Sequence, residues 1–181
     1  HWNDMFHQTT EKMGMHPFPI PGGTIGAPFT NPLGINLAPC TYCGFCAFYG
    51  CGNWSKSSPN ACVIPALMDR KNFTLLTECT VLKADKAADG KTLRGVTFQD
   101  SDGNIGFQPA DIVVISAYQL DNVRLLLLSQ IGTPYDPTTR KGTIGRAYNY
   151  QTMAYGFLYF ENKHMNPFIS TGALSTQIDD F

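Results

Sequence analysis

Four cysteines lie close together between residues 40 and 51, and they restrict this chain more than any other feature of its sequence. Their spacing is C-x2-C-x2-C-x4-C, in the stretch "CTYCGFCAFYGC" that begins at Cys40. Disulfides suit this pattern poorly, because neighbouring cysteines of one short loop rarely reach the required separation and torsion together. Structural zinc sites usually take two well-separated ligand pairs, and the sequence holds no second pair of this kind.

Tightly spaced thiolates are typical of iron–sulfur clusters, and C-x2-C-x2-C is the general pattern. The bacterial ferredoxin motif continues as C-x3-C-P, whereas here four residues separate Cys46 from Cys51, and Gly52 follows. The spacing therefore leaves an iron–sulfur centre and a structural cysteine-rich loop both open. We interpret Cys62 and Cys79 as small apolar residues rather than ligands.

Composition narrows the class of protein. With 181 residues and 43% hydrophobic content, the chain can form a real core. Its net charge is −1 and its Lys and Arg residues are scattered, so nothing favours binding to nucleic acid or anionic lipid. The longest apolar run, Leu125 to Leu128, is much too short to cross a membrane.

The sequence pattern predicts a mixed α/β (α+β) fold. A helix is expected over residues 2–13, followed by a Gly- and Pro-rich loop. Alternating apolar residues predict two antiparallel strands, over 73–86 and 92–100, joined by the turn signal "ADG". "SDGN" at 101–104 predicts a second turn.

The run "DIVVISA", residues 111–117, predicts a strand of the parallel-sheet type, because it offers no polar face. A helix follows over 120–130, with Asp121 as its cap and Val123, Leu126 and Leu127 as its packing stripe. One parallel strand cannot form a sheet, and the chain has neither a starting Met nor a closing signal. We therefore expect a fragment, in which residues 112–115 are unusually exposed.

Three blocks of sequence together carry a resemblance to a known family. They are "CTYCGFCAFYGCGNWSKSSP", "TVLKADKAADGKTLRGVTFQD" and "ADIVVISAYQLDNVRLLLLSQIG". In this order they resemble the middle of a flavin-dependent glucose-methanol-choline (GMC) oxidoreductase. The nearest subgroup is that of the bacterial membrane-bound gluconate and related sugar dehydrogenases, and the resemblance runs from about Asn31 to the C-terminus.

The resemblance implies a part of a GMC-type FAD-binding fold. It places the main chain of Val81 against the adenine of FAD, with Ser116, Ala117 and Tyr118 as further cofactor-binding residues. Two departures are notable: Tyr118 stands where glycine or alanine is common, and Gln130 replaces a glycine at the end of the helix. The second puts the tightness of that turn in doubt.

The resemblance also implies a second cofactor, an iron–sulfur cluster of the 3Fe-4S type held by three thiolates. We assign Cys40, Cys46 and Cys51 as its ligands, and Cys43 could replace one of them. No catalytic residue is assigned, because the family's catalytic His and its partner are expected beyond the C-terminus. The chain alone is therefore expected to be inactive.

The function implied is that of an FAD-dependent enzyme that oxidises a CH–OH group of a sugar or sugar acid such as gluconate. Electrons would pass from the flavin through the cluster to a cytochrome c subunit, beside a small accessory subunit. The expected location is the periplasmic face of the bacterial inner membrane, with membrane attachment only through the partner subunits. The alternative is a non-catalytic β-rich binding module stapled by zinc or disulfides.

The same comparison of motifs predicts a division of the chain into three regions. Residues 1–70 would hold the N-terminal helix and the cysteine loop, and residues 71–132 would form part of the FAD-binding domain. Residues 133–181 would begin the substrate-binding domain.

Overall fold

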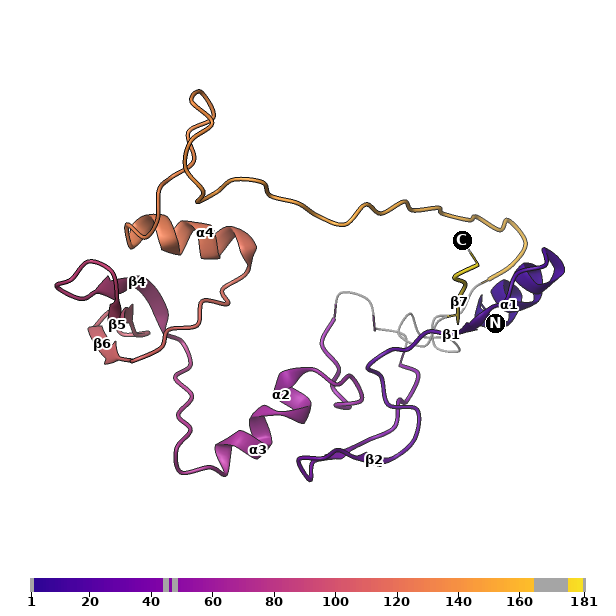
Figure 1. The fold of residues 1–181 in the computed structure, drawn as a ribbon. Helices are drawn as coiled ribbons and strands as arrows, with labels where there is room; N and C mark the ends of the chain where they lie inside the picture. The colour runs from indigo at the N-terminus through magenta and orange to yellow at the C-terminus, as the bar shows by residue number, and fades with distance from the viewer. Residues whose placement is uncertain (1, 44–45, 47–48, 165–175, 181) are drawn as a thin grey trace. The chain divides into compact units, whose positions relative to one another are not determined.

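The computed structural model describes residues 2–43, 46, 49–164 and 176–180 (Figure 1). The chain forms two compact units. The first comprises His1–Leu75 together with Gly156–Phe181, and the second comprises Leu76–Tyr155. Residues 40–51, which we call the cysteine segment, therefore belong to the first unit. The residues predicted to bind FAD belong to the second.

The first unit begins with helix α1 (Trp2–Lys12), which confirms the predicted N-terminal helix. The rings of Trp2 and Phe6 are one turn apart on one face, with their centroids separated by 6.2 Å. The helix ends at Lys12 and is followed by Gly14, whose φ of +80° is left-handed. There the N–H of Met15 donates to the carbonyl of Thr10 at 3.0 Å, as in a Schellman motif.

The other elements of the first unit are short, because Gly and Pro are frequent between residues 17 and 39. They are β1 (Phe18–Pro19), β2 (Phe29–Thr30), β3 (Asn36–Leu37), α2 (Pro59–Cys62), α3 (Ile64–Met68) and β7 (Thr176–Gln177). The strands pair antiparallel, β1 with β7 and β2 with β3. The first of these pairs joins segments from the two ends of the sequence.

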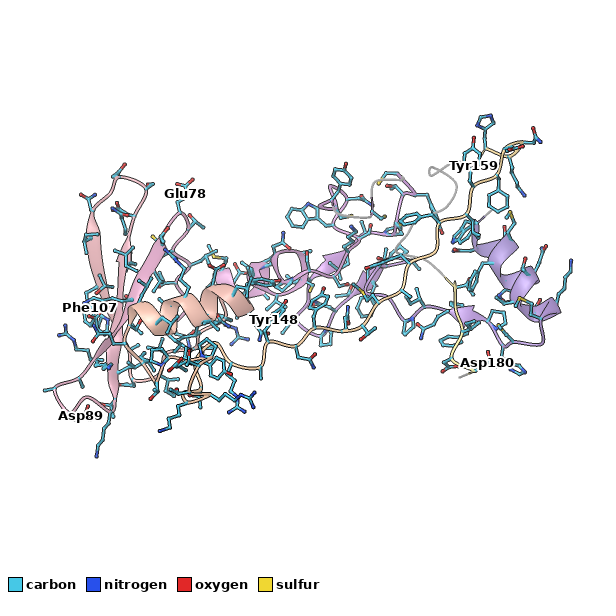
Figure 2. The ribbon with its side chains drawn as sticks, turned by 90° about the horizontal axis from the view of Figure 1, so that it is seen from above. Glu78, Asp89, Phe107, Tyr148, Tyr159 and Asp180 are labelled. Carbon is cyan, nitrogen blue, oxygen red and sulfur yellow. The ribbon has the colours of Figure 1, made fainter. Side chains whose placement is uncertain are left out.

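The second unit is built on an antiparallel meander of β4 (Thr80–Lys86), β5 (Leu93–Gln99) and β6 (Ile105–Pro109). Both predicted turns and the antiparallel pairing are confirmed, and Asp89 marks the first turn in Figure 2. The first strand begins seven residues later than predicted, at Thr80 rather than residue 73. The preceding residues include Glu78 with a left-handed φ of +55°, which interrupts an extended chain.

Helix α4 (Gln119–Leu128) packs against β4, as Figures 1 and 2 show. A buried serine joins the two elements. The N–H of Ala84 donates to the Ser129 hydroxyl oxygen at 2.8 Å, and that hydroxyl donates to the Leu125 carbonyl at 2.6 Å. The helix end is therefore fixed to the sheet by hydrogen bonds as well as by apolar contact.

Two details of the predicted helix are wrong. Tyr118, not Asp121, is the residue that precedes the first turn; Asp121 lies within that turn, where its charge still suits the positive helix end. Leu127 is 41% exposed, whereas Val123 and Leu126 are half-buried. The hydrogen bonds of Ser129 fix the rotation of the helix and leave Leu127 off its packed side.

The predicted parallel-type strand at residues 111–117 does not form: in the structure these residues belong to no strand. The predicted exposure is confirmed, since Ile112 is 82% and Val114 is 81% exposed. The physical reason is that the described sheet is antiparallel throughout and offers no parallel neighbour. Its last strand ends at Pro109, which has no N–H for a further ladder.

Candidate functional site

The cysteine segment is anchored at both ends by hydrogen bonds. The N–H of Cys40 donates to the Ile25 carbonyl at 2.8 Å. The side-chain amide of Asn53 donates to the Pro39 carbonyl at 2.6 Å. Ser55, which is 1% exposed, accepts a main-chain hydrogen bond from Ile25 at 2.8 Å. Residues 39–40 and 53–55 are thus held together around the buried residue Ser55.

The turn after Cys51 directs main-chain N–H groups at its sulfur. Trp54 adopts a left-handed φ of +57°, and its N–H donates to the Cys51 carbonyl at 3.2 Å. A left-handed residue in a tight turn lets successive N–H groups converge on one anion. Here the N–H groups of Lys56, Asn53 and Ser55 are hydrogen-bonded to the thiol of Cys51.

These contacts change the acidity of the thiol. Partial burial acts to raise the pKa of Cys51, but the three N–H groups and the positive charge of Lys56 together lower it below its ordinary value. The surroundings of Cys51 thus favour its thiolate form.

The ammonium group of Lys56 binds within the loop. It donates to the carbonyl of Cys46, and to the carbonyl of Tyr49 at 2.9 Å. The main chain of Lys56 also bridges to Thr24. Lys56 therefore fixes Cys46 and Tyr49 relative to Cys51. Sequence reasoning missed this residue, because a single Lys in "GNWSKSSP" carries no spacing signal.

A cavity of about 510 Å³ lies beside this turn. It is lined by Tyr49, Gly50, Cys51, Gly52, Trp54, Lys56, Ser58 and Asn60. A second cavity, of about 380 Å³, shares Gly52, Trp54 and Asn60 with the first. Trp54 is 53% exposed and forms part of the wall of both.

In the second unit, the predicted adenine contact Val81 lies on β4, opposite Phe98 of β5. Its side chain is 41% exposed. In the described sheet β4 is an outer strand, so one edge of its main chain faces no other strand. An irregularity in the register between Val81 and Lys83 further disturbs the pairing here.

The segment from Ser116 to Tyr118 directly precedes α4 and is exposed. It is held by the first turn of the helix: the N–H of Ala117 donates to the side-chain oxygen of Asn122 at 2.7 Å. Tyr118 has a left-handed φ of +71°, and its side chain is 65% exposed. The positive φ accounts physically for glycine being common at this position of the resembled family.

The turn at the other end of α4 is closed despite Gln130. This residue is also left-handed, with φ of +54°. Its N–H donates to Leu127 at 3.0 Å, and the N–H of Ile131 donates to Leu126 at 2.9 Å. This is the Schellman pattern, so glutamine here keeps the tight turn at some cost in backbone strain.

The GMC oxidoreductase family model matches residues 24–152, which is about half of the first unit and nearly all of the second. The chain belongs to the GMC oxidoreductase family. It is also 40% identical over 178 residues to the gluconate 2-dehydrogenase flavoprotein of Pantoea cypripedii. That alignment covers 98% of this chain and 29% of the relative, so the chain spans less than a third of the relative's length. No solved structure matches.

GMC oxidoreductases bind FAD. The second unit of this chain has features that are compatible with a part of an FAD-binding site. The outer edge of β4 offers main-chain groups that no strand pairs with, as an adenine contact through the backbone of Val81 requires. Val81, Ser116, Ala117 and Tyr118 all lie in this one compact unit. Their individual assignment to FAD stays a prediction.

The placement of the described cysteine thiols, in contrast, does not fit a metal site. Cys40, Cys43, Cys46 and Cys51 are all described, and within the described residues no group of three His, Cys, Asp or Glu side chains is placed to hold a metal ion. All six cysteines are free thiols, so no disulfide staples the loop. The cluster ligands likewise stay a prediction. In the described part of the GMC chain, no helix is long and apolar enough to span a membrane.

Proposed function

We propose that this chain is part of an FAD-dependent dehydrogenase that oxidises a CH–OH group of a sugar acid of the gluconate type. The observation that carries the proposal is the 40% identity to a gluconate 2-dehydrogenase flavoprotein over nearly the whole chain. Family membership favours this function over a cysteine-stapled binding module. We further propose that the catalytic histidine and its partner lie in parts of the whole protein that this chain does not contain.

Within such an enzyme, bound FAD supplies the chemistry of accepting a hydride equivalent from the substrate carbon. The residues of this chain serve to bind and orient it. The unpaired edge of β4 at Val81 would meet the adenine through main-chain groups. The side chain of Asn122 would hold residues 117–118 in shape at the start of α4, because a helix N-terminus is a common binding place for the phosphates of a dinucleotide.

The test uses the full-length protein. It should purify with a flavin absorbance spectrum, and anaerobic gluconate should bleach the flavin band, whereas methanol and choline should leave it unchanged. A preparation that carries no flavin, or a flavin that gluconate leaves oxidised while an alcohol reduces it, would contradict the proposal.

We also propose the finer assignment: electrons leave the flavin through an iron–sulfur cluster to a cytochrome c subunit, beside a small accessory subunit, at the periplasmic face of the inner membrane. The cysteine spacing supports the cluster; the described positions of the thiols add no support. In the full-length protein, Cys40→Ser should lower the iron content, and Cys79→Ser, the matched control, should leave it unchanged. Equal iron in both variants would overturn the ligand assignment.

A further inference from the structure

Trp54 presents a large aromatic surface to solvent in the first unit. Its side chain is 53% exposed, although indole rings are mostly buried in folded proteins. Its φ of +57° is rare for a bulky residue, and backbone strain of this kind is found most often at ligand-binding sites. Trp54 lines both cavities, and the smaller one also has the nearly buried Leu37 and Ala61 in its wall. The cavities therefore offer apolar surface to a molecule that enters them.

The smaller cavity is framed by three segments that side-chain amides join together. Strand β3, helix α2 and the turn at residues 52–54 each contribute to its wall. The amide of Asn31 donates to the Cys62 carbonyl at 2.8 Å, which ties the β2–β3 hairpin to α2. The amide of Asn53 donates to the Pro39 carbonyl at 2.6 Å, which ties the turn to the residues after β3. The cavity is thus formed before any ligand arrives.

Two asparagines supply hydrogen-bond donors to this wall. Asn36 lines the smaller cavity, and Asn60 lines both. The side-chain oxygen of Asn36 accepts from the Thr30 hydroxyl at 2.7 Å, and that of Asn60 accepts from the Ser58 hydroxyl. Since each amide oxygen already has a donor, each amide NH₂ group is left to donate to water or to a ligand.

The wall also carries a positive charge that no acidic side chain balances. Lys56 lines the larger cavity, and neither cavity has an Asp or Glu in its described wall. Its ammonium group has three N–H donors, and the carbonyls of Cys46 and Tyr49 accept two of them. Among the described residues no carboxylate forms an ion pair with it. The third N–H and the charge are therefore available to an anionic group.

We propose that the two cavities around Trp54 form one binding site for a sugar acid. The indole contacts the C–H groups of the ligand, and the amides of Asn36 and Asn60 donate to its hydroxyl groups. The ammonium group of Lys56 binds its carboxylate, since one positive charge matches a singly charged anion better than a doubly charged phosphate. Apolar surface with a few convergent polar groups, in a volume of about 300–1,000 Å³, is typical of small-molecule sites.

The wall alone predicts a ligand that is both polyhydroxylated and anionic. The choice of a gluconate-type acid among such ligands rests on the proposed function. The site lies within the first unit, whereas the residues that we assign to FAD lie in the second. Its test therefore has to report binding at Trp54 and not oxidation at the flavin.

The experiment uses the full-length flavoprotein labelled with 5-fluorotryptophan and followed by fluorine NMR. The resonances of Trp54 and Trp2 are assigned by their loss in Trp54→Phe and Trp2→Phe. Dithionite first reduces the flavin, so that added D-gluconate can bind but cannot be oxidised. The Trp54 resonance should shift saturably with gluconate, whereas that of Trp2, which lines neither cavity, should stay in place.

Two further probes separate the parts of the ligand. Sorbitol has the carbon chain and hydroxyl groups of gluconate with a CH₂OH group in place of the carboxylate, and acetate has a carboxylate without hydroxyl groups. Each should bind about tenfold more weakly than gluconate or less tightly still, because sorbitol lacks the charged hydrogen bond and acetate lacks the contacts to the indole and the amides.

Variants of the wall test the two polar contacts separately. Lys56→Met should weaken gluconate binding about tenfold and leave sorbitol binding unchanged, and Lys56→Arg should restore most of the affinity. Lys71→Met, at an exposed lysine of the same unit, is the matched control and should bind like wild type. Asn60→Leu should weaken gluconate and sorbitol alike, about fivefold, and its control Asn72→Leu should weaken neither.

The proposal is overturned if gluconate leaves the Trp54 resonance in place, if acetate binds as tightly as gluconate, or if Lys56→Met binds gluconate like wild type. Should Lys56→Met fail to fold, Lys56→Arg and Lys56→Gln provide the same comparison, with and without the charge. A separate oxidised sample tests the proposed function through its flavin absorbance. Gluconate that shifts Trp54 but never bleaches the flavin refutes that function and supports the site; a bleached flavin with an unmoved Trp54 resonance does the reverse.

Discussion

Gln130 and Tyr118 are residues whose side-chain type does not suit the backbone conformation that they adopt. Both have a positive φ without being glycine, and they stand at the two ends of α4. A left-handed conformation costs an L-residue about 1–2 kcal/mol relative to glycine, less the extra entropy that glycine loses on folding. Tyr118 therefore stores strain in the segment that we assign to FAD binding, and Gln130 stores it at the opposite end of α4.

Replacing Gln130 by glycine should stabilise the last turn of α4 by about 0.5–1 kcal/mol, since the strain is removed and the turn is kept. Hydrogen exchange of the α4 amides in the full-length protein measures this. The matched control Gln119→Gly, in the first turn of the same helix, should destabilise it by about the same amount. A Gln130→Gly protein whose α4 amides exchange faster than wild type would show that the side chain does more than tolerate the turn.

Gly95 is required for a different reason. Its φ is +150°, and an added Cβ would lie 2.1 Å from the Gln108 carbonyl oxygen, far inside contact distance. Gly95→Ala should therefore cost about 3 kcal/mol or more, measured as a fall in the urea midpoint of the full-length protein. Gly103→Ala is the control: its φ is also positive, but its nearest neighbour would be 3.8 Å away, so about 1 kcal/mol is expected. Equal losses of stability in the two variants would mean that backbone strain, and not a steric clash of the added Cβ, determines the cost of both.

Among the elements, the contact between α4 and β4 depends on Ser129. Replacing Ser129 by alanine removes the acceptor of the Ala84 N–H and leaves a buried donor unsatisfied. The expected cost is about 1–3 kcal/mol, seen as faster exchange of the β4 and α4 amides together. Ser129→Thr keeps the hydroxyl and Ser101→Ala changes an exposed turn, so both should stay near wild type. Exchange that rises in α4 alone would argue against a coupled pair.

The elements also show what a sequence can predict. The α1 helix, both turns of the meander and its antiparallel pairing follow from local periodicity and turn chemistry, which act over a few residues. The strand at 111–117 and the packed side of α4 did not follow, because both depend on which partner is present. Residues 112–115 have the composition of a parallel strand, but no described segment pairs with them in parallel. The hydroxyl of Ser129 helps to set the rotation of the helix.

The candidate site, too, could be predicted from the sequence only in part. Cysteine spacing identified the segment but not its geometry, since the contacts that shape it come from Asn53, Trp54 and Lys56, whose residue types carry no signal at these positions. The resemblance placed Val81 and residues 116–118 in what proved to be one compact unit. It could not indicate that Asn122 would hold Ala117, because that hydrogen bond depends on a main-chain turn.

At the scale of the whole chain, the first unit joins the two ends of the sequence, and one ion pair reinforces this. The ring nitrogen Nδ1 of His16 lies 2.6 Å from a carboxylate oxygen of Asp180, and the His16 N–H donates to the other oxygen at 3.0 Å (Figure 2 labels Asp180). The hydrogen bond and charge of Asp180 raise the pKa of His16 above 6.5. Hydrogen bonds from the main chain and ring of His16 lower the pKa of Asp180 below 3.8.

The pH dependence of this pair has a definite sign. The contribution of His16 is complete below 6.5 and is lost as pH rises through its raised pKa; that of Asp180 is present above 3.8 and is lost as pH falls through its lowered pKa. The β1–β7 pairing should therefore be firmest in mildly acidic solution. In an NMR titration Asp180→Asn should lower the pKa of His16, and the neighbouring Asp179→Asn should leave it in place. If the pKa of His16 is the same in the Asp180→Asn variant as in the wild type, the ion pair does not form in solution.

The turn that carries Trp54 also gives the protein an internal reporter. The chain has two tryptophans, Trp2 and Trp54, and both belong to the first unit. Selective excitation of indole therefore follows that unit alone, while the second unit is visible only through its tyrosines. Because a thiolate quenches indole emission at short range, the fluorescence of Trp54 should brighten when the turn around Cys51 opens, so the state of the cysteine segment can be followed without any added label.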